Sequence, residues 1–180
     1  MELSLLHSSL LSSVVPAAFN RRDRIMSEKH YWEEVEIGTE IKPLVKVATT
    51  QMLVKWAGAS GDFNPLHFDS IYAESIGVGK IIIHGALKRQ WLIQLLTDWV
   101  GEHGILRKFS CQYGAMDYPR HMKTITKPDE GETWICKGQV TKKYVEGDQH
   151  FIDCKIWLEN GKGETTTHGR ATVILPAKSA

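Results

Sequence analysis

The segment 84–103, HGALKRQWLIQLLTDWVGEH, constrains the fold more than any other part of the chain. Large apolar side chains recur in it three and four positions apart, as on one side of a helix. These residues are Leu87, Trp91, Leu92, Leu95, Leu96 and Trp99. Gln90, Gln94 and Asp98 form a polar stripe. The pattern predicts a long amphipathic helix that starts near Gly85, and we expect a sheet to wrap around it.

After Gly104 the pattern changes from helix to strand. Four runs rich in β-branched and aromatic residues are separated by turn sequences such as EGDQ and NGKG. The expected strands cover residues 105–118, 133–145, 150–160 and 165–175. Consecutive strands joined by short turns predict an antiparallel sheet.

The region before the long helix shows one strand and two shorter helices. A strand is expected within 40–50, and Thr50 is a good N-cap for a helix over 51–60. Asp69 is the expected N-cap of a short helix that Gly77 closes. One strand, helices and then a run of antiparallel strands predict a single α+β domain, with the sheet around one central helix.

The overall composition is that of an ordinary soluble domain. The chain has 180 residues and a net charge of +1, with acids and bases mixed along it. This balance gives no electrostatic reason to expect nucleic acid or an anionic membrane as a partner. Cys111, Cys136 and Cys154 are far apart and odd in number, which suits a reducing cytoplasm and predicts buried core residues. No apolar run approaches the roughly 20 residues that span a bilayer.

The first 25 residues differ from the rest. Segment 1–25 is rich in Ser and Leu and becomes basic at Arg21, Arg22 and Arg24, after its apolar part. A secretory signal would carry its positive charges before the apolar part. An organelle-targeting segment is one interpretation. The other is an extension from an upstream start codon, with the domain proper at 26–180 beginning at Met26.

The stretch SGDFNPLHFD, residues 60–69, holds the strongest candidate catalytic groups. Asp62 and His67 lie five positions apart across a turn that contains Pro65. Such a turn can bring a carboxylate and an imidazole to one water, as acid–base catalysis requires. Asn64 lies between them and could position either group. The alternative is that these are ordinary turn residues and that His67 is a surface histidine.

A second feature, IIIHGAL, places Gly85 at the expected start of the long helix. The N-terminus of a helix has unpaired N–H groups and a partial positive charge, so it can hold a developing oxyanion. Glycine would let a carbonyl approach the backbone closely, although a close contact between helix and sheet would also require it. The eight histidines show neither HxxxH nor HExxH spacing, and phosphate-loop and GxSxG motifs are absent. We therefore expect no metal and no cofactor.

These two motifs together resemble the MaoC-like (R)-specific enoyl-CoA hydratase family, which has the hotdog fold. The family pattern G-D-x-N-P-x-H is matched at Gly61, Asp62, Asn64, Pro65 and His67, and the downstream H-G element at His84-Gly85. A weaker likeness extends from about Tyr31 to Pro176.

The resemblance implies a hydro-lyase. Asp62 and His67 would activate a water that adds reversibly across the C2–C3 double bond of an enoyl-CoA, giving a 3-hydroxyacyl-CoA. The N–H of Gly85 would hold the thioester oxygen, and Asn64 and His84 would support the pair. A homodimer, in which two long helices lie against a continuous sheet, is also implied.

The chain departs from the family pattern at Lys88-Arg89, where relatives carry small or apolar residues. Lys88 falls on the apolar arc between Leu95 and Trp99, and two cations in the first turn oppose the helix dipole. One interpretation is an anionic partner near that turn, either an acyl-chain carboxylate or a CoA phosphate. The other is that both side chains extend along the surface to water.

The second departure is an apparent insertion at 118–134, which would shape the acyl pocket or an oligomer contact. Alternatives to a CoA hydratase also remain. The same chemistry on an acyl carrier protein would favour a basic entrance, to which Arg107-Lys108 or Lys142-Lys143 could contribute. A noncatalytic acyl-binding subunit and a thioesterase are the others.

Overall fold

The computed structural model describes residues 30–120 and 133–178. The N-terminal extension, Met26 and most of the insertion predicted at 118–134 lie outside these described residues. Those two predictions therefore stay as predictions.

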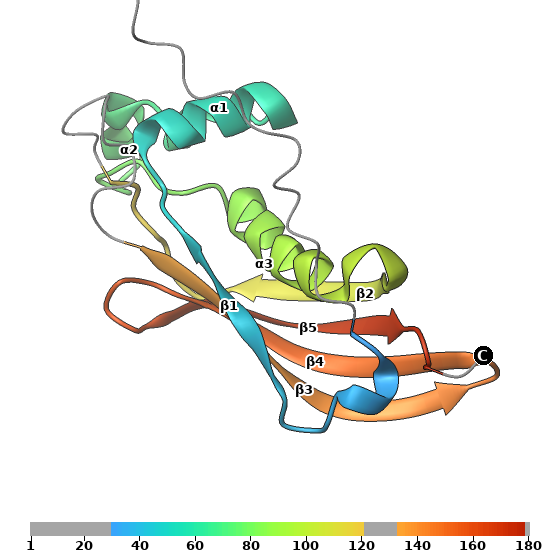
Figure 1. The fold of residues 1–180 in the computed structure, drawn as a ribbon. Coiled ribbons are helices and arrows are strands. Elements are labelled where there is room, and N and C mark those ends of the chain that lie inside the picture. Colours follow the sequence, from blue (N-terminus) through green and yellow to red (C-terminus); the bar gives the residue numbers. More distant parts are fainter. Residues whose placement is uncertain (1–29, 121–132, 179–180) are drawn as a thin grey trace, which may run out of the picture.

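One antiparallel sheet forms the body of the molecule (Figure 1). Its strands, in spatial order, are β1 (Glu40–Lys46), β3 (Trp134–Glu146), β4 (Gln149–Glu159), β5 (Thr165–Leu175) and β2 (Ile105–Tyr113). Burial alternates along the first part of β3, from Trp134 to Val140, as expected for a strand with one face on the core and the other toward solvent. The strands predicted from the sequence are confirmed, although β2 ends at Tyr113 and the prediction extended it to residue 118.

The long helix α3 (Gly85–Val100) lies across one face of this sheet, which curves beneath it (Figure 1). It contacts all five strands. Its apolar side is buried as predicted, and Leu92 and Leu96 have no exposed surface. The α+β arrangement with one central helix is therefore confirmed. Burying a leucine of this kind contributes about 1.5–3 kcal/mol, so a row of them fixes the helix on the sheet.

Two shorter helices, α1 (Thr50–Ser60) and α2 (Ser70–Ser75), lie at the end of the molecule where α3 begins (Figure 1). Asp69 caps α2 as predicted and accepts hydrogen bonds from two backbone N–H groups. The predicted cap of α1 was wrong by one residue. Thr49 rather than Thr50 is the N-cap, because the Thr49 side chain accepts from the N–H of Met52.

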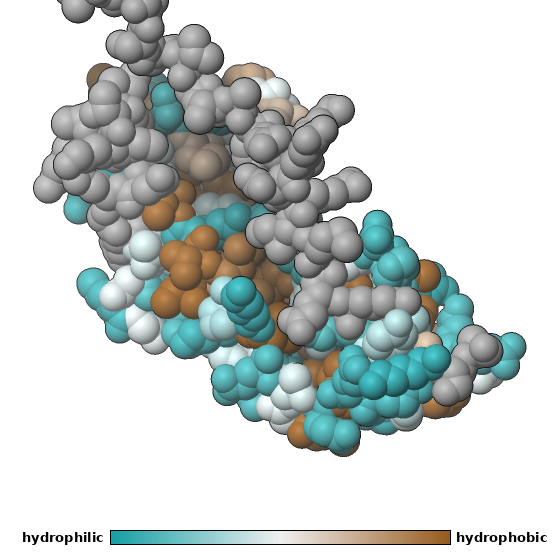
Figure 2. Space-filling model, viewed as in Figure 1, coloured by the Kyte–Doolittle hydropathy of each residue, from teal (hydrophilic) through white to brown (hydrophobic). Residues whose placement is uncertain are grey.

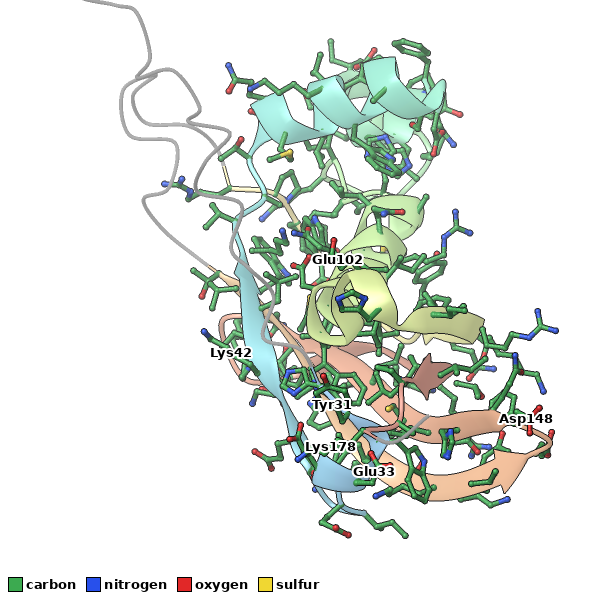
Figure 3. All side chains as sticks on the ribbon, turned by 45° about the vertical axis from the view of Figure 1, so that its right-hand side comes forward. Tyr31, Glu33, Lys42, Glu102, Asp148 and Lys178 are labelled. Atoms are coloured by element: carbon green, nitrogen blue, oxygen red, sulfur yellow. The ribbon has the colours of Figure 1, made fainter. Side chains whose placement is uncertain are left out.

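Three single-turn 3-10 helices complete the fold: η1 (Trp32–Glu34), η2 (Pro65–His67) and η3 (Gly101–His103). The last described residues pack on η1 (Figure 3). Lys178 Nζ lies 2.6 Å from the Glu34 carboxylate, and the backbone N–H of Lys178 donates to Glu33. No helix in the described ranges is long and apolar enough to cross a membrane.

The cysteines take the core positions that the sequence predicts. Cys136 and Cys154 are buried, and burial raises the pKa of each thiol to about 12. Cys111 is half-buried and packs against the same core. All three are free thiols, so the fold is held by packing rather than by disulfides.

Gly169 in β5 is the glycine at which a side chain would collide most directly with the sheet. A Cβ there would meet the Ser110 carbonyl oxygen and Cys111 on the adjacent strand β2. We expect Gly169→Ala to lower the free energy of unfolding by roughly 2–3 kcal/mol, because backbone must move to admit it. Gly58→Ala is the control, since nothing lies near that position in α1, and it should stabilise by about 0.5–1 kcal/mol. Urea unfolding of both variants measures the difference, and equal stabilities would contradict this account.

Candidate active site

The turn that follows α1 places Asp62. Gly61 ends the helix with a φ of 75°, a left-handed conformation that glycine adopts without steric cost. The N–H of Asp62 then donates to the Ser60 hydroxyl, which itself donates to a carbonyl in α1. The Asp62 carboxylate is half-buried, so water can reach it.

Asn64 shapes the next part of the turn. Its side-chain oxygen accepts from the N–H of Leu66 at 3.1 Å, which makes Asn64 the N-cap of η2. Pro65 occupies the first position of that turn, where its missing N–H costs nothing. Asn64 therefore acts on the backbone that carries His67, and its support of the Asp62–His67 pair stays a prediction.

His67 ends η2 and is oriented by one strong hydrogen bond. Its Nδ1 lies 2.8 Å from the carbonyl oxygen of Ile82. A carbonyl can only accept, so Nδ1 carries the proton and donates. In the neutral ring Nε2 is then left with a free lone pair. The residue as a whole is 8 % exposed, so only a small part of it can reach a ligand.

His84 stacks on His67 and is fully buried. The ring centroids are 3.7 Å apart and the planes are tilted by 22°. Nε2 of His84 donates to the carbonyl oxygen of Asp62 at 3.3 Å. Burial lowers the pKa of His84, and the adjacent His67 lowers it further, so this imidazole stays neutral at physiological pH.

Asp62, His67 and His84 therefore form one cluster. Their side-chain donor atoms all lie within 4.8 Å of one another. Such a group could hold a divalent metal ion, although no histidine spacing in the sequence indicated it. In each histidine one ring nitrogen donates to a backbone carbonyl. Nδ1 of His84 is buried and has no hydrogen-bond partner among residues 30–120 and 133–178.

Gly85 is the first residue of α3, and His84 is its N-cap. In the described part of the chain no hydrogen bond engages the N–H of Gly85, since the first donors into the helix are Leu87 and Lys88. His84 stacks on His67 and belongs to the cluster. Gly85 is the next residue in the chain, so its free N–H follows the cluster in sequence. The partial positive charge of a 16-residue helix is concentrated there.

Tyr113 closes one side of the Gly85 position. A Cβ on Gly85 would lie 2.9 Å from a ring carbon of Tyr113, at the end of β2. The glycine is therefore required by a side chain from the sheet. This contact between Tyr113 and Gly85 is the close contact between helix and sheet that the sequence analysis offered as one reason for the glycine. It leaves the N–H of Gly85 free.

The anion beside Lys88 belongs to this chain. Lys88 Nζ lies 2.8 Å from the Asp117 carboxylate, and the two side chains are 3 % and 2 % exposed. The expectation that Lys88 extends to water was wrong, because sheet and helix close over it. A ligand anion is no longer needed to explain the burial of this lysine. Arg89 is exposed and remains a candidate for substrate binding.

The lysines proposed as a basic entrance lie on the sheet. Lys108 and Lys142 line a hollow of about 750 Å³ with Lys155 and Arg170. Lys143 packs over the ring of Trp32, 4.3 Å from its centroid. None of the lining residues of this hollow belongs to the cluster at Asp62, so the structure keeps the two apart.

The sequence matches a family model, described as the MaoC like domain, over residues 33–144. This match covers more than half of the chain and includes the whole cluster. The chain belongs to the MaoC-like family. No curated protein sequence matches it.

Solved structures show the same fold at low identity. The (R)-hydratase from A. caviae involved in PHA biosynthesis is 23% identical, with a TM-score of 0.66, over 80% of this chain and 99% of that one. R-hydratase PhaJ1 from Pseudomonas aeruginosa is 19% identical, with a TM-score of 0.68, over 82% and 86%. A MaoC-like dehydratase from Rhodospirillum rubrum is 16% identical, with a TM-score of 0.68, over 84% and 99%. The predicted hotdog fold is confirmed.

Sequence reasoning missed Tyr113 and Asp117. Both follow from the way in which β2 returns beside the start of α3, a contact between residues more than 25 positions apart. Lys88 was the one available signal, since a cation on an apolar arc predicts a buried anion somewhere. Nothing in the sequence said which of the 21 acidic residues would supply it.

The lowered pKa of His84 predicts how stability depends on pH. In the unfolded chain this residue returns to its ordinary pKa near 6.5, so the unfolded state binds more protons as the pH falls through that value. The free energy of unfolding should therefore be fully developed above about pH 7 and decrease below it. We expect His84→Asn to reduce this slope, and thermal melts across the range measure it. His168→Asn, at an exposed position in β5, should leave the slope unchanged. Equal slopes in all three proteins would contradict the assignment.

Proposed function

We propose that this protein is a hydratase or dehydratase that adds water reversibly to the C2–C3 double bond of an enoyl-CoA. One observation carries the proposal. Asp62 and His67 lie in one cluster with His84, and the next residue, Gly85, begins α3 with a free N–H. This is the combination of an acid–base pair with an oxyanion donor that hydration of a thioester requires.

The acid–base pair would act on a single bound water. Nε2 of His67 can accept a hydrogen bond from it, because Nδ1 is committed to Ile82. The carboxylate of Asp62 can accept a second. The water oxygen forms a bond to C3 while the pair takes one of its protons. A proton is then returned to C2, so the net change is the addition of H₂O. Dehydration is the reverse of these steps.

The N-terminus of α3 would stabilise the charge that develops on the substrate. As oxygen bonds to C3, the electron pair of the double bond shifts toward the thioester oxygen. The N–H of Gly85 and the helix dipole would hold that oxygen as it gains enolate character. A donor of this kind typically contributes a factor of roughly 10²–10³ to kcat.

His84 would hold Asp62 and His67 in position while it remains uncharged itself. Its neutral ring stacks on His67 and its Nε2–H holds the Asp62 carbonyl. Its lowered pKa, caused by burial and then by His67, makes it a weak base for the transferred proton. Asn64 would act indirectly, because it caps the turn that carries His67.

A homodimer is part of the proposal. Large apolar side chains around the site turn are exposed in the single chain, among them Phe63, Phe68 and Ile71 at 61 %, 42 % and 79 %. Figure 2 shows hydrophobic surface also over β1, where Val45 is 56 % exposed. A second copy would cover such surface and complete the acyl pocket. Sedimentation analysis tests for the homodimer. A measured mass equal to that of one chain would contradict this part of the proposal.

The nature of the acyl carrier needs its own comparison. Arg89 is an exposed cation in the first turns of α3 that could bind an acyl carboxylate or a CoA phosphate. The same reaction on an acyl carrier protein is the alternative, as are a noncatalytic acyl-binding subunit and a thioesterase. The test is to offer matched enoyl-CoA and enoyl-carrier-protein substrates, with and without a terminal carboxylate, and to follow double-bond loss and release of free thiol. A cytoplasmic location remains a prediction.

Asp62→Asn and His67→Gln should each lower kcat/KM by roughly 10²-fold or more, because each removes one partner of the activated water. The loss of enoyl-thioester absorbance measures the rate, with and without a metal chelator. Loss of activity on chelation and its return with Zn²⁺ would instead indicate a metal at Asp62, His67 and His84.

Two variants make the same chemical changes nearby. Asp69→Asn keeps the cap of α2, since asparagine is an equally good N-cap, and should retain full activity. His168→Gln alters an exposed histidine and should also be neutral. A folded wild-type protein that hydrates no enoyl thioester of either carrier would overturn the proposed function.

A further inference from the structure

The ion pair between Lys88 and Asp117 lies close to the start of α3. Lys88 is the fourth residue of the helix, and side chains on a helix point back toward its N-terminus. Its Nζ donates to Asp117 Oδ2 at 2.8 Å and to the carbonyl oxygen of Ala115 at 2.9 Å. The segment just after β2 is thereby tied to the first turn of α3.

Asp117 connects three separate parts of the structure. Its Oδ1 accepts from the indole Nε1 of Trp134, at the start of β3, at 2.9 Å. Its backbone carbonyl accepts from the N–H of Ile83 at 2.8 Å. Ile83 precedes His84 and Gly85, and Lys88 follows them. One residue thus holds the chain on both sides of the His84–Gly85 element.

Stability alone is a poor explanation for this pair. Removing two charges from water costs several kcal/mol per ion, and apolar replacements of buried ion pairs are often neutral or stabilising. Helix α3 is already fixed by its apolar contacts with all five strands. The pair is better explained by what it does for the local geometry.

The bonds of Asp117 also keep its carboxylate away from the helix end. A carboxylate near the first turn of a helix ordinarily caps the free N–H groups there. Here the two carboxylate oxygens are directed to Lys88 and to Trp134, and among the described residues neither accepts from the N–H of Gly85. The N–H of Gly85 therefore stays available for a ligand.

We propose that Lys88 and Asp117 are positioning residues for the oxyanion site, because they hold His84–Gly85 in register and keep the Asp117 carboxylate from capping Gly85. The inference rests on the proposed function and extends it to two residues that touch no reacting atom. It also gives Lys88, which the sequence singled out as anomalous, a role inside the protein.

The structure supplies a matched control in the sheet. Lys137 pairs with Glu159 at 2.6 Å, and Glu159 also accepts from the indole Nε1 of Trp157 at 2.7 Å. This set of lysine, carboxylate and tryptophan repeats the chemistry of Lys88, Asp117 and Trp134. It lies on β3 and β4, away from the start of α3.

The experiment compares Lys88→Met, Lys88→Met with Asp117→Leu, and Lys137→Met. In Lys88→Met the carboxylate of Asp117 loses its cation and can cap Gly85, so kcat should fall by roughly 10- to 100-fold. In the double variant the leucine has no side-chain oxygen that could cap Gly85, so part of kcat should return. Lys137→Met should keep the wild-type kcat. Rates are measured well below the melting temperature of each variant.

A pH profile separates positioning from general damage. An unpaired, buried carboxylate has a raised pKa, so lowering the pH should neutralise it. Lys88→Met should therefore recover activity relative to wild type as the pH falls, and the double variant should not. Folded Lys88→Met and double variants with wild-type kcat at every pH would overturn the proposal.

Two further arms keep the outcome clear. If Lys88→Met does not fold, Asp117→Asn takes its place, with Lys88→Arg as the variant that keeps the cation. Wild-type kcat in Asp117→Asn would contradict the inference. If wild type hydrates no thioester, the proposed function fails by itself. The amide signal of Gly85 in ¹⁵N-glycine-labelled protein then tests the pair: it should shift in Lys88→Met and not in Lys137→Met, and an unshifted signal would overturn it.

Discussion

The burial of α3 against the curved sheet is the interaction on which the rest of the structure depends. The helix contacts every strand, and Leu92 and Leu96 are completely enclosed. Because these contacts bury the apolar side of the helix along its length, its direction and its starting point are fixed together. The N-terminus of α3 therefore opens at one defined place, beside the turn that joins α1 to α2.

The candidate site is assembled from the ends of elements rather than from their middles. Asp62 follows the end of α1, His67 ends η2, and Gly85 begins α3. Helix ends have backbone groups without partners inside the helix. Here some of the backbone groups near these ends orient side chains of the site. The carbonyls of Ile82 and Asp62 orient the two histidines, and the N–H of Gly85 has no hydrogen bond within the described residues.

The same region is where the chain departs from simple rules of burial. A histidine with no exposed surface and a lysine that is 2 % exposed lie within four positions of each other. Burying each of these polar side chains costs free energy. Stacking on His67 offsets this cost for the histidine, and the ion pair with Asp117 offsets it for the lysine. Such exceptions gather where geometry has to be specified more closely than apolar packing can do it.

The sequence by itself determined the helix at 85–100, the strands, the cap at Asp69 and the pairing of Asp62 with His67 across Pro65. These depend on local periodicity and on turn chemistry, which are written within a few residues. Only the tertiary structure decided that Asp117 would partner Lys88, that Tyr113 would cover Gly85, and that His84 would stack on His67. Those contacts form because β2 and the turn that carries Asp62 and His67 pack against the start of α3. The residues in each contact are far apart in the sequence, so no local sequence pattern predicts them.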